Sequence, residues 1–191
     1  MKYPLILRIN HAMLAAGVVI QLLLGLVMDE DGPGADGILG RVGMELHEIV
    51  GMVVLAALLL RWALFPLGYV PYGVGHYFPW FSKARMRDVF RDLTAGLGLA
   101  WRDPSKQAHL GGAIQGLLLL LATVLALSGA AMFFSPAKAG ASPALVDVFK
   151  EIHEATGSII WFFLVLHLTA TVAYLAAGHR AVLSMFKFTG E

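Results

Sequence analysis

Four long apolar stretches dominate the hydrophobic pattern of this chain. Residues 9–28 hold no Asp, Glu, Lys or Arg, and the other stretches lie at about 46–67, 109–134 and 152–178. A helix needs about 20 mainly apolar residues to cross a bilayer, so each stretch is long enough to span one. The pattern predicts an all-α membrane protein, a four-transmembrane-helix bundle that forms a single domain over residues 1–191.

The residues between the second and third stretches form two different segments. Residues 62–81 hold eight of the chain's twenty aromatic residues and three prolines, a composition that suits the membrane–water interface. Residues 82–101 repeat apolar side chains at three- and four-residue spacing, with basic residues mostly opposite them. This spacing predicts an amphipathic helix that lies on the cytoplasmic leaflet.

The composition excludes a soluble globular protein and a disordered chain. Apolar residues make up 58% of the sequence and charged residues 14%, against about 45–50% and about 25% in soluble domains. The chain has no cysteine and seven histidines. Disulfides, iron–sulfur clusters, thiolate zinc sites and covalent c-type haem are thereby excluded. Any bound metal is expected to use imidazole ligands.

Lysine and arginine are distributed unevenly between the predicted loops. Eleven lie in the N-terminus, the middle loop with the end of the second stretch, and the tail, whereas three lie in the first and third loops. The positive-inside rule then places both termini and the middle loop in the cytoplasm. An acidic run at residues 29–31 follows the first stretch where a signal peptide would carry a small-residue cleavage site.

Four histidines fall within or at the ends of the predicted spans. His11 lies at the cytoplasmic start of the first span, and His47 lies at the outer start of the second. His153 lies at the outer start of the fourth span, and His167 follows it fourteen residues later. Fourteen residues return a helix to the same face within about 40° and advance it by about 21 Å. His47 and His153 therefore match in depth near the outer surface, and His11 and His167 match in the cytoplasmic half.

Two depth-matched pairs predict two bis-imidazole centres stacked across the bilayer. Imidazole suits iron, and a porphyrin iron with two axial histidines suits electron transfer. We expect two haem centres whose iron is bound by these four histidines. A single membrane histidine is more often a hydrogen-bonded packing residue, but chance is the weaker explanation for matched pairs with a repeated glycine motif.

The repeated motif is His-Glu-x-x-Gly. Gly51 follows His47 by four residues, and Gly157 follows His153 by four. Residues four apart share a helical face, so each glycine is a candidate cofactor-binding residue against which a flat macrocycle lies. A helical zinc protease has a second histidine where these motifs have glycine, so the sequence does not support a zinc site.

Three cationic or titratable residues on the cytoplasmic side are further candidates. Arg61 is either a topology signal or a counter-charge for a haem propionate. His109 and Lys106 lie at the cytoplasmic start of the third span. A quinone carbonyl needs a hydrogen-bond donor and its reduction needs a protonatable neighbour, which a histidine and a lysine supply. We name them candidate catalytic residues of a quinone site, with an ordinary interfacial histidine as the alternative.

The four-span plan and the order of the four histidines resemble the bacterial cytochrome b561 and nickel–iron hydrogenase b-type cytochrome superfamily. The cytochrome b subunit of membrane formate dehydrogenase is similar. The fourteen-residue spacing in the last span, the glycines of Leu-Leu-Gly in the first and Leu-Ser-Gly in the third, and Arg61 carry this likeness over nearly the whole chain. It implies two haem b groups and electron exchange with membrane quinone.

The resemblance also implies partners. We expect a periplasmic-side redox subunit of dehydrogenase, hydrogenase or cytochrome c type over the outer haem, membrane lipid around the helices, and no nucleic acid. Ala12 replaces the tryptophan that commonly follows the first histidine, and the middle loop is long and aromatic; both departures favour a partner-bound subunit. The alternatives are a stand-alone quinone reductase, for example one that oxidises superoxide, and a redox-inactive membrane scaffold or transporter.

Overall fold

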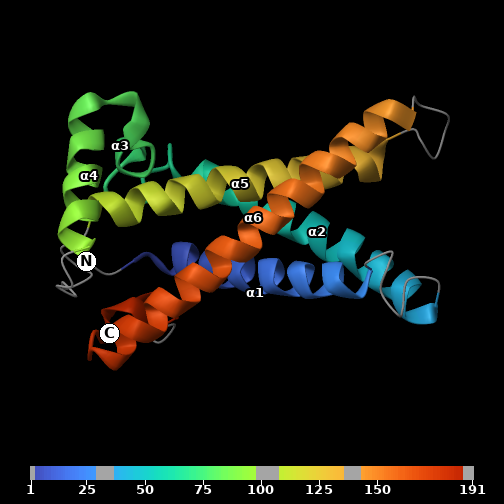
Figure 1. The fold of residues 1–191 in the computed structure, drawn as a ribbon, viewed down its shortest axis with the longest axis horizontal. Helices are drawn as coiled ribbons and strands as arrows, with labels where there is room; N and C mark the ends of the chain where they lie inside the picture. The colour runs from blue at the N-terminus through green and yellow to red at the C-terminus, as the bar shows by residue number, and fades with distance from the viewer. Residues whose placement is uncertain (1–2, 29–36, 98–107, 136–142, 187–191) are drawn as a thin grey trace. The chain divides into compact units, whose positions relative to one another are not determined.

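The computed structural model describes residues 3–28, 37–97, 108–135 and 143–186, and all regular elements within these ranges are helices (Figure 1). The long helices are α1 (Leu5–Val27), α2 (Ile38–Leu64), α5 (Ala108–Phe134) and α6 (Pro143–Ala176). Between α2 and α5 lie the short helix α3 (Val74–Tyr77), the 3-10 turn η1 (Pro79–Phe81) and α4 (Lys83–Leu97). The 3-10 segment η4 (Arg180–Phe186) follows α6.

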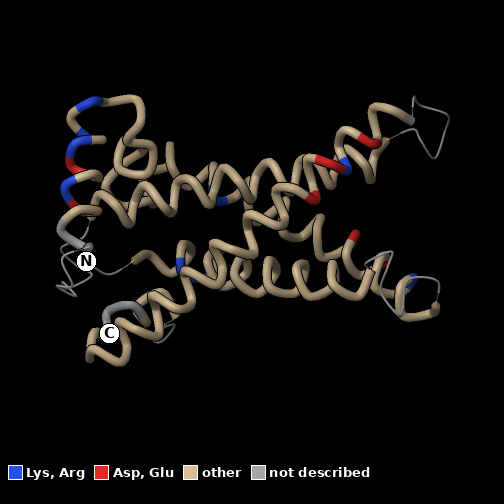
Figure 2. The backbone as a smooth tube through the Cα atoms, viewed as in Figure 1, with Lys and Arg blue, Asp and Glu red and all other residues tan. Residues whose placement is uncertain are grey.

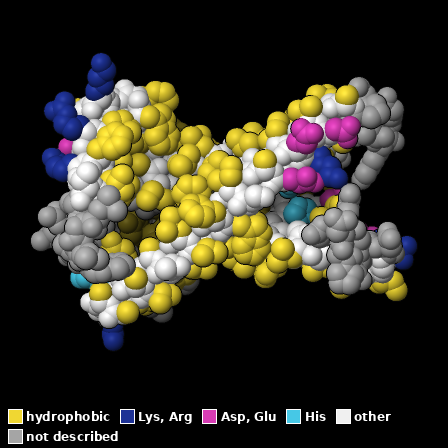
Figure 3. All heavy atoms as spheres, in the orientation of Figure 1, with side chains coloured by type: hydrophobic (Ala, Val, Ile, Leu, Met, Phe, Trp, Pro, Cys, Tyr) yellow, Lys and Arg dark blue, Asp and Glu magenta, His cyan; other side chains and the backbone are white. Residues whose placement is uncertain are grey.

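The four long helices are each long and apolar enough to cross a membrane, which confirms the predicted number of spans. Large apolar side chains on them stay exposed, including Leu26 at 61%, Phe162 at 67% and Val172 at 65%. Apolar side chains also cover much of the face seen in Figure 3. In water such exposure would be costly, so these faces are suited to lipid.

The chain divides into two compact units, each built from parts of the long helices. The first unit comprises residues 1–9, 61–120 and 162–191, and the second comprises residues 10–60 and 121–161. The core of the first unit contains Leu7, Leu64 and Val70 together with Tyr77 and Phe78. The aromatic segment between α2 and α4 therefore folds back into this unit and supplies most of its buried side chains.

Two glycines of α5 allow the aromatic segment to pack closely against that helix. A Cβ atom on Gly116 would collide with the carbonyl group of Tyr77, and one on Gly112 would collide with the ring and carbonyl of His76. Trp62 also stacks on Phe78, with ring centroids 5.6 Å apart and planes 11° apart. The small residues on α5 and the stack of Trp62 on Phe78 thus fix where His76 lies.

The second unit contains contacts between α1 and α2. Asn10 is fully buried, and its Nδ2 donates a hydrogen bond of 2.8 Å to the carbonyl oxygen of Ala57. Gly17 lies against Val54, where a Cβ atom would meet the valine side chain. Small and polar residues at this interface match the usual way in which membrane helices associate.

Among the described residues, the prevailing sign of the charged side chains differs between the two units (Figure 2). In the first unit, Lys83, Arg85, Arg87 and Arg91 lie on α4, where Arg91 pairs with Asp88 at 3.0 Å. In the second unit the acidic side chains are Glu45, Glu48, Asp147, Glu151 and Glu154. On α4, Val89 is buried whereas Phe90 and Leu93 are exposed, and residues 98–101 of the predicted interfacial helix lie outside the described residues.

Candidate functional site

Two of the predicted ligand histidines lie together in the second unit. His47 is on α2 and His153 is on α6, and their ring centroids are 6.0 Å apart with the planes at 72°. Both rings are half-buried. The two imidazoles come from different helices, 106 positions apart in the sequence, so tertiary packing creates the pair.

The ring of His153 is held by α5. Its Nδ1 lies 2.9 Å from the carbonyl oxygen of Leu125 and 3.1 Å from the hydroxyl oxygen of Ser128. A carbonyl oxygen only accepts, so Nδ1 carries the proton and Nε2 keeps its lone pair for a metal. Metal-binding histidines are commonly held in this way by a backbone carbonyl. A Cβ atom on Gly129 would lie 3.0 Å from Cε1 of the same ring.

His47 is held through its backbone. Nε2 of Gln21, on α1, donates a hydrogen bond of 3.0 Å to the carbonyl oxygen of His47. The ring nitrogen Nδ1 of His47 is buried and has no hydrogen-bond partner within the described ranges. Buried polar atoms nearly always have a partner, so an unpartnered imidazole nitrogen beside a second imidazole is suited to binding a ligand.

The pair fits a haem with two axial imidazoles. Metal–imidazole bonds of about 2 Å, with about 1 Å more from nitrogen to ring centre, put two axial rings about 6 Å apart. The observed separation of 6.0 Å agrees with this. In the part of the chain that the structure describes, no group of three His, Cys, Asp or Glu side chains is placed to hold a metal ion. A porphyrin needs none, because it supplies four of the iron's ligands itself.

The two motif glycines have different surroundings. The space beside Gly51 holds the amide of Gln21, whose Nε2 would lie 2.7 Å from a Cβ atom there. Beside Gly157 the nearest atom to such a Cβ is Cδ1 of Leu125 at 3.8 Å, an ordinary contact. A methyl group would therefore fit beside Gly157, whereas Gly51 allows the close packing of α1 on α2.

The remaining sequence candidates lie as follows. His11 is on α1 in the second unit and His167 is on α6 in the first, so their pairing stays a prediction. The carbonyl oxygen of His167 accepts a 2.8 Å hydrogen bond from Thr171. Arg61 is half-buried in the last turn of α2. Lys106 lies outside the described residues.

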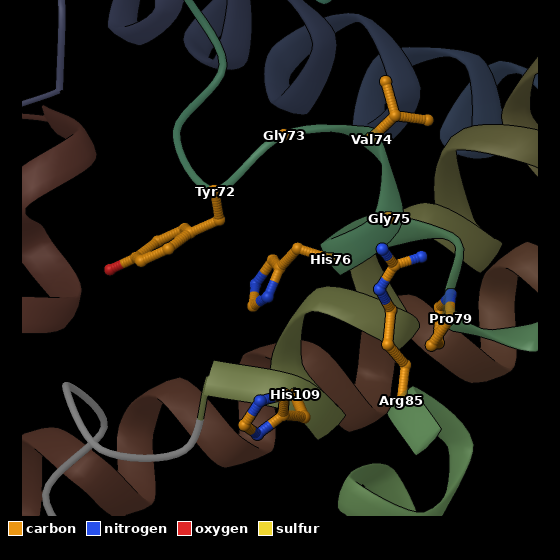
Figure 4. Close-up of a pocket in the computed structure, with 8 residues that line it drawn as sticks. All are labelled: Tyr72, Gly73, Val74, Gly75, His76, Pro79, Arg85 and His109. Atoms are coloured by element: carbon orange, nitrogen blue, oxygen red, sulfur yellow. The ribbon is translucent and has the colours of Figure 1, made fainter. Parts of the chain in front are cut away.

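His109 lies at a cavity that the sequence did not predict. The cavity has a volume of about 480 Å³ and is lined by residues of the first unit that include Tyr72, Val74, His76, Arg85 and His109. Figure 4 shows the two imidazoles on the same side of this space, with Arg85 rising past them toward Gly75. The ring centroids of His76 and His109 are 6.4 Å apart, and those of Tyr72 and His76 are 4.7 Å apart.

Asp92 of α4 ties His109 to the start of α5. One carboxylate oxygen, Oδ2, accepts hydrogen bonds from the backbone N–H groups of His109 at 3.1 Å and Leu110 at 3.3 Å. The same oxygen lies 3.4 Å from Nδ1 of His109. A carboxylate that bonds the first free N–H groups of a helix stabilises the helix start, and here it also orients the imidazole.

Sequence reasoning missed Asp92 and the position of His76. His76 sits in an irregular aromatic segment, where no periodicity shows which way a side chain points. Asp92 is an acidic residue on the basic face of α4, and this exception to the charge pattern was the one sequence feature that pointed to its role. Leu125 was not predictable as a partner of His153, since it acts through its backbone oxygen.

One protein family, described as prokaryotic cytochrome b561, has a model that matches residues 2–188 of this chain. A search of curated proteins and a search of solved structures each gave no match. The family match covers all four long helices and confirms the resemblance seen in the sequence.

Proposed function

Since this chain belongs to the prokaryotic cytochrome b561 family, and so is a multi-pass membrane b-type cytochrome of electron transfer, we propose that it binds two haem b groups. In this proposal it passes electrons between a redox partner on the outer face and the membrane quinone pool. The pair His47 and His153 carries the proposal, because two half-buried imidazoles from different helices lie 6.0 Å apart with one ring held by α5.

His47 and His153 hold the outer haem in this proposal. A haem held by these two imidazoles would supply one-electron transfer. The chain contributes the ring of His153, which the Leu125 carbonyl oxygen holds, and a glycine at position 157, four residues later on the same helix.

The inner haem is assigned to His11 and His167. The fourteen-residue spacing of His153 and His167 supports this, because it returns α6 to nearly the same face one bilayer leaflet away. Arg61, in the last turn of α2, is the proposed counter-charge for a propionate. His109 and Lys106 remain the proposed quinone-site residues.

The charge pattern supports the orientation. The basic residues of α4 and the exposed Phe90 and Leu93 fit a helix on the cytoplasmic leaflet of the bacterial inner membrane. The acidic side chains of the second unit then face the periplasm, where they suit a redox subunit with a basic docking surface. Both termini are cytoplasmic in this arrangement.

Haem content tests the proposal. We expect about two haems per chain by pyridine haemochrome assay, in line with two bis-histidine sites, and complete extraction of the haem by acid–acetone. Protein with His179→Ala serves as a control, because His179 lies outside every proposed ligand pair. A haem content near zero, or haem that stays with the chain after extraction, contradicts the proposal.

A further inference from the structure

The cavity of the first unit brings together two imidazoles that belong to no proposed haem site. His76 comes from α3 and His109 from the first turn of α5, with ring centroids 6.4 Å apart. Both line a space of about 480 Å³, which lies within the range of about 300–1,000 Å³ that small-molecule sites occupy. Two groups that can donate and accept protons thus face one ligand-sized space.

The walls of the cavity suit a flat, partly apolar ring. Tyr72 places its ring 4.7 Å from that of His76, at an angle of 34°. Tyr72 is 57% exposed and Val74 is 53% exposed, so an apolar ligand approaching from lipid meets apolar side chains first. Glycine at position 73, with φ of 72°, lets the chain turn there so that Tyr72 and His76 lie beside each other.

The two imidazoles have different electrostatic surroundings. Burial and the neighbouring His109 lower the pKa of His76 below its usual value. His109 instead lies beside the Asp92 carboxylate at 3.4 Å. Other titratable or charged groups at the cavity are Tyr72, before α3, and Arg85 on α4. Both imidazoles face the same space, and an imidazole can take up and release a proton near neutral pH.

Resting on the proposed function, we propose that His76 and His109 are the two proton-transferring groups of the quinone reaction, and that Asp92 is the positioning residue of His109. Written as reduction, a quinone takes two electrons from the cytochrome and two protons from the protein. Each imidazole takes up one proton from water on the cytoplasmic side and then gives one N–H proton to a carbonyl oxygen, so that a new O–H bond forms and the ring returns to its neutral form. Quinol oxidation is the reverse.

Asp92 acts through His109 and does not touch the ligand. Its Oδ2 bonds the backbone N–H groups of His109 and Leu110 and lies beside Nδ1 of the ring. This holds Nδ1 in its protonated form and turns Nε2 away from the carboxylate. An aspartate–histidine pair of this kind fixes the tautomer and orientation of the imidazole.

Photolabelling locates the ligand without requiring activity. Purified protein in mild detergent is illuminated with an azido-quinone, and the labelled peptides are identified by mass spectrometry. We expect labels on residues 72–80 and near residue 109, removed by excess decylubiquinone. Labels confined to other segments, or displaced by phosphatidylglycerol and not by decylubiquinone, overturn the proposal.

Stopped-flow kinetics test the roles of the residues. The cytochrome is reduced with dithionite and mixed with decylubiquinone, and its reoxidation is followed by absorbance. His76→Gln and His109→Gln should each slow reoxidation by about 10²-fold, the usual contribution of a general acid or base. Asp92→Asn should slow it less and change its pH profile. Unchanged rates in both histidine variants, with normal spectra, overturn the proposal.

Matched controls separate chemistry from misfolding. Gly112→Ala should slow reoxidation because its Cβ collides with His76, whereas Gly111→Ala should not, since its Cβ meets nothing within 4 Å. His179→Gln should leave the rate unchanged. The two proposals also fail separately. If the protein holds no haem but residues 72–80 and 109 are labelled and decylubiquinone removes the label, the quinone site stands and the cytochrome proposal is rejected. If the haem content is normal but these residues are not labelled, the cytochrome proposal stands and the quinone site is rejected.

Discussion

Gly129 is the residue on which the position of the His153 ring depends. It lies five residues before the end of α5, and a Cβ there would stand 3.0 Å from Cε1 and 3.4 Å from Nδ1 of that ring. The contact at 3.0 Å is tighter than ordinary packing, so an added methyl group would displace the ring by a few tenths of an ångström.

We therefore predict that Gly129→Ala lowers the occupancy of one haem and shifts its reduction potential. Gly25→Ala is the matched control, because a Cβ on Gly25 meets nothing within 4 Å. Haem content and a redox titration of both variants check this. Equal haem content and equal reduction potentials in the two variants would contradict the predicted effect of the contact between Gly129 and His153.

Tyr77 makes the stability of the first unit fall at alkaline pH. Burial, together with the neighbouring phenols of Tyr3 and Tyr72, raises the pKa of its phenol to about 12, and Arg61 opposes this rise. In the unfolded chain the phenol ionises near pH 10. Its stabilising contribution is therefore complete below pH 10 and is lost as the pH rises to about 12, a difference of about 2–3 kcal/mol.

Tyr77→Phe should accordingly flatten the fall in thermal stability between pH 9.5 and 11.5, about the range of that titration. Tyr69→Phe, at a side chain that is 45% exposed, should keep the fall of the parent protein. Denaturation midpoints in detergent measure both. The same alkaline slope in all three proteins would show that Tyr77 does not control it.

At the scale of the elements, the four spans followed from length and hydropathy alone, since a membrane helix needs only enough apolar residues to cross. The pairing of His47 with His153 was also predictable in depth. The contacts of His153 were not, because Leu125 and Ser128 reach the ring only at one rotation of α5 against α6. Neither residue carries a sequence signal for that rotation, and the same holds for His76 beside His109.

Asn10 joins two elements, since its buried amide donates to the Ala57 carbonyl oxygen at 2.8 Å. Hydrogen bonds between membrane helices contribute about 0.6 kcal/mol on average and up to about 1.7. Asn10→Ala should lower the unfolding free energy by about 1 kcal/mol. Ser158→Ala removes a bond within α6 only and should cost less, as thermal denaturation of both variants would reveal.

At the scale of the whole molecule, charge sets the topology. The eleven-to-three distribution of Lys and Arg predicts that both termini stay in the cytoplasm. Reporter fusions after residue 37 and after residue 191 should report opposite compartments, with residue 191 inside. Periplasmic reporter activity at residue 191 would reverse the assignment of the acidic second unit to the outer face.

The central claim is that His47 and His153 bind one and the same haem. Haem content and low-temperature reduced spectra of His47→Ala and His153→Ala test it most directly, beside the parent protein. The account predicts that each variant retains one haem, with the same spectrum and the same potential in both. Two haems in either variant, or different remaining haems in the two, would contradict it.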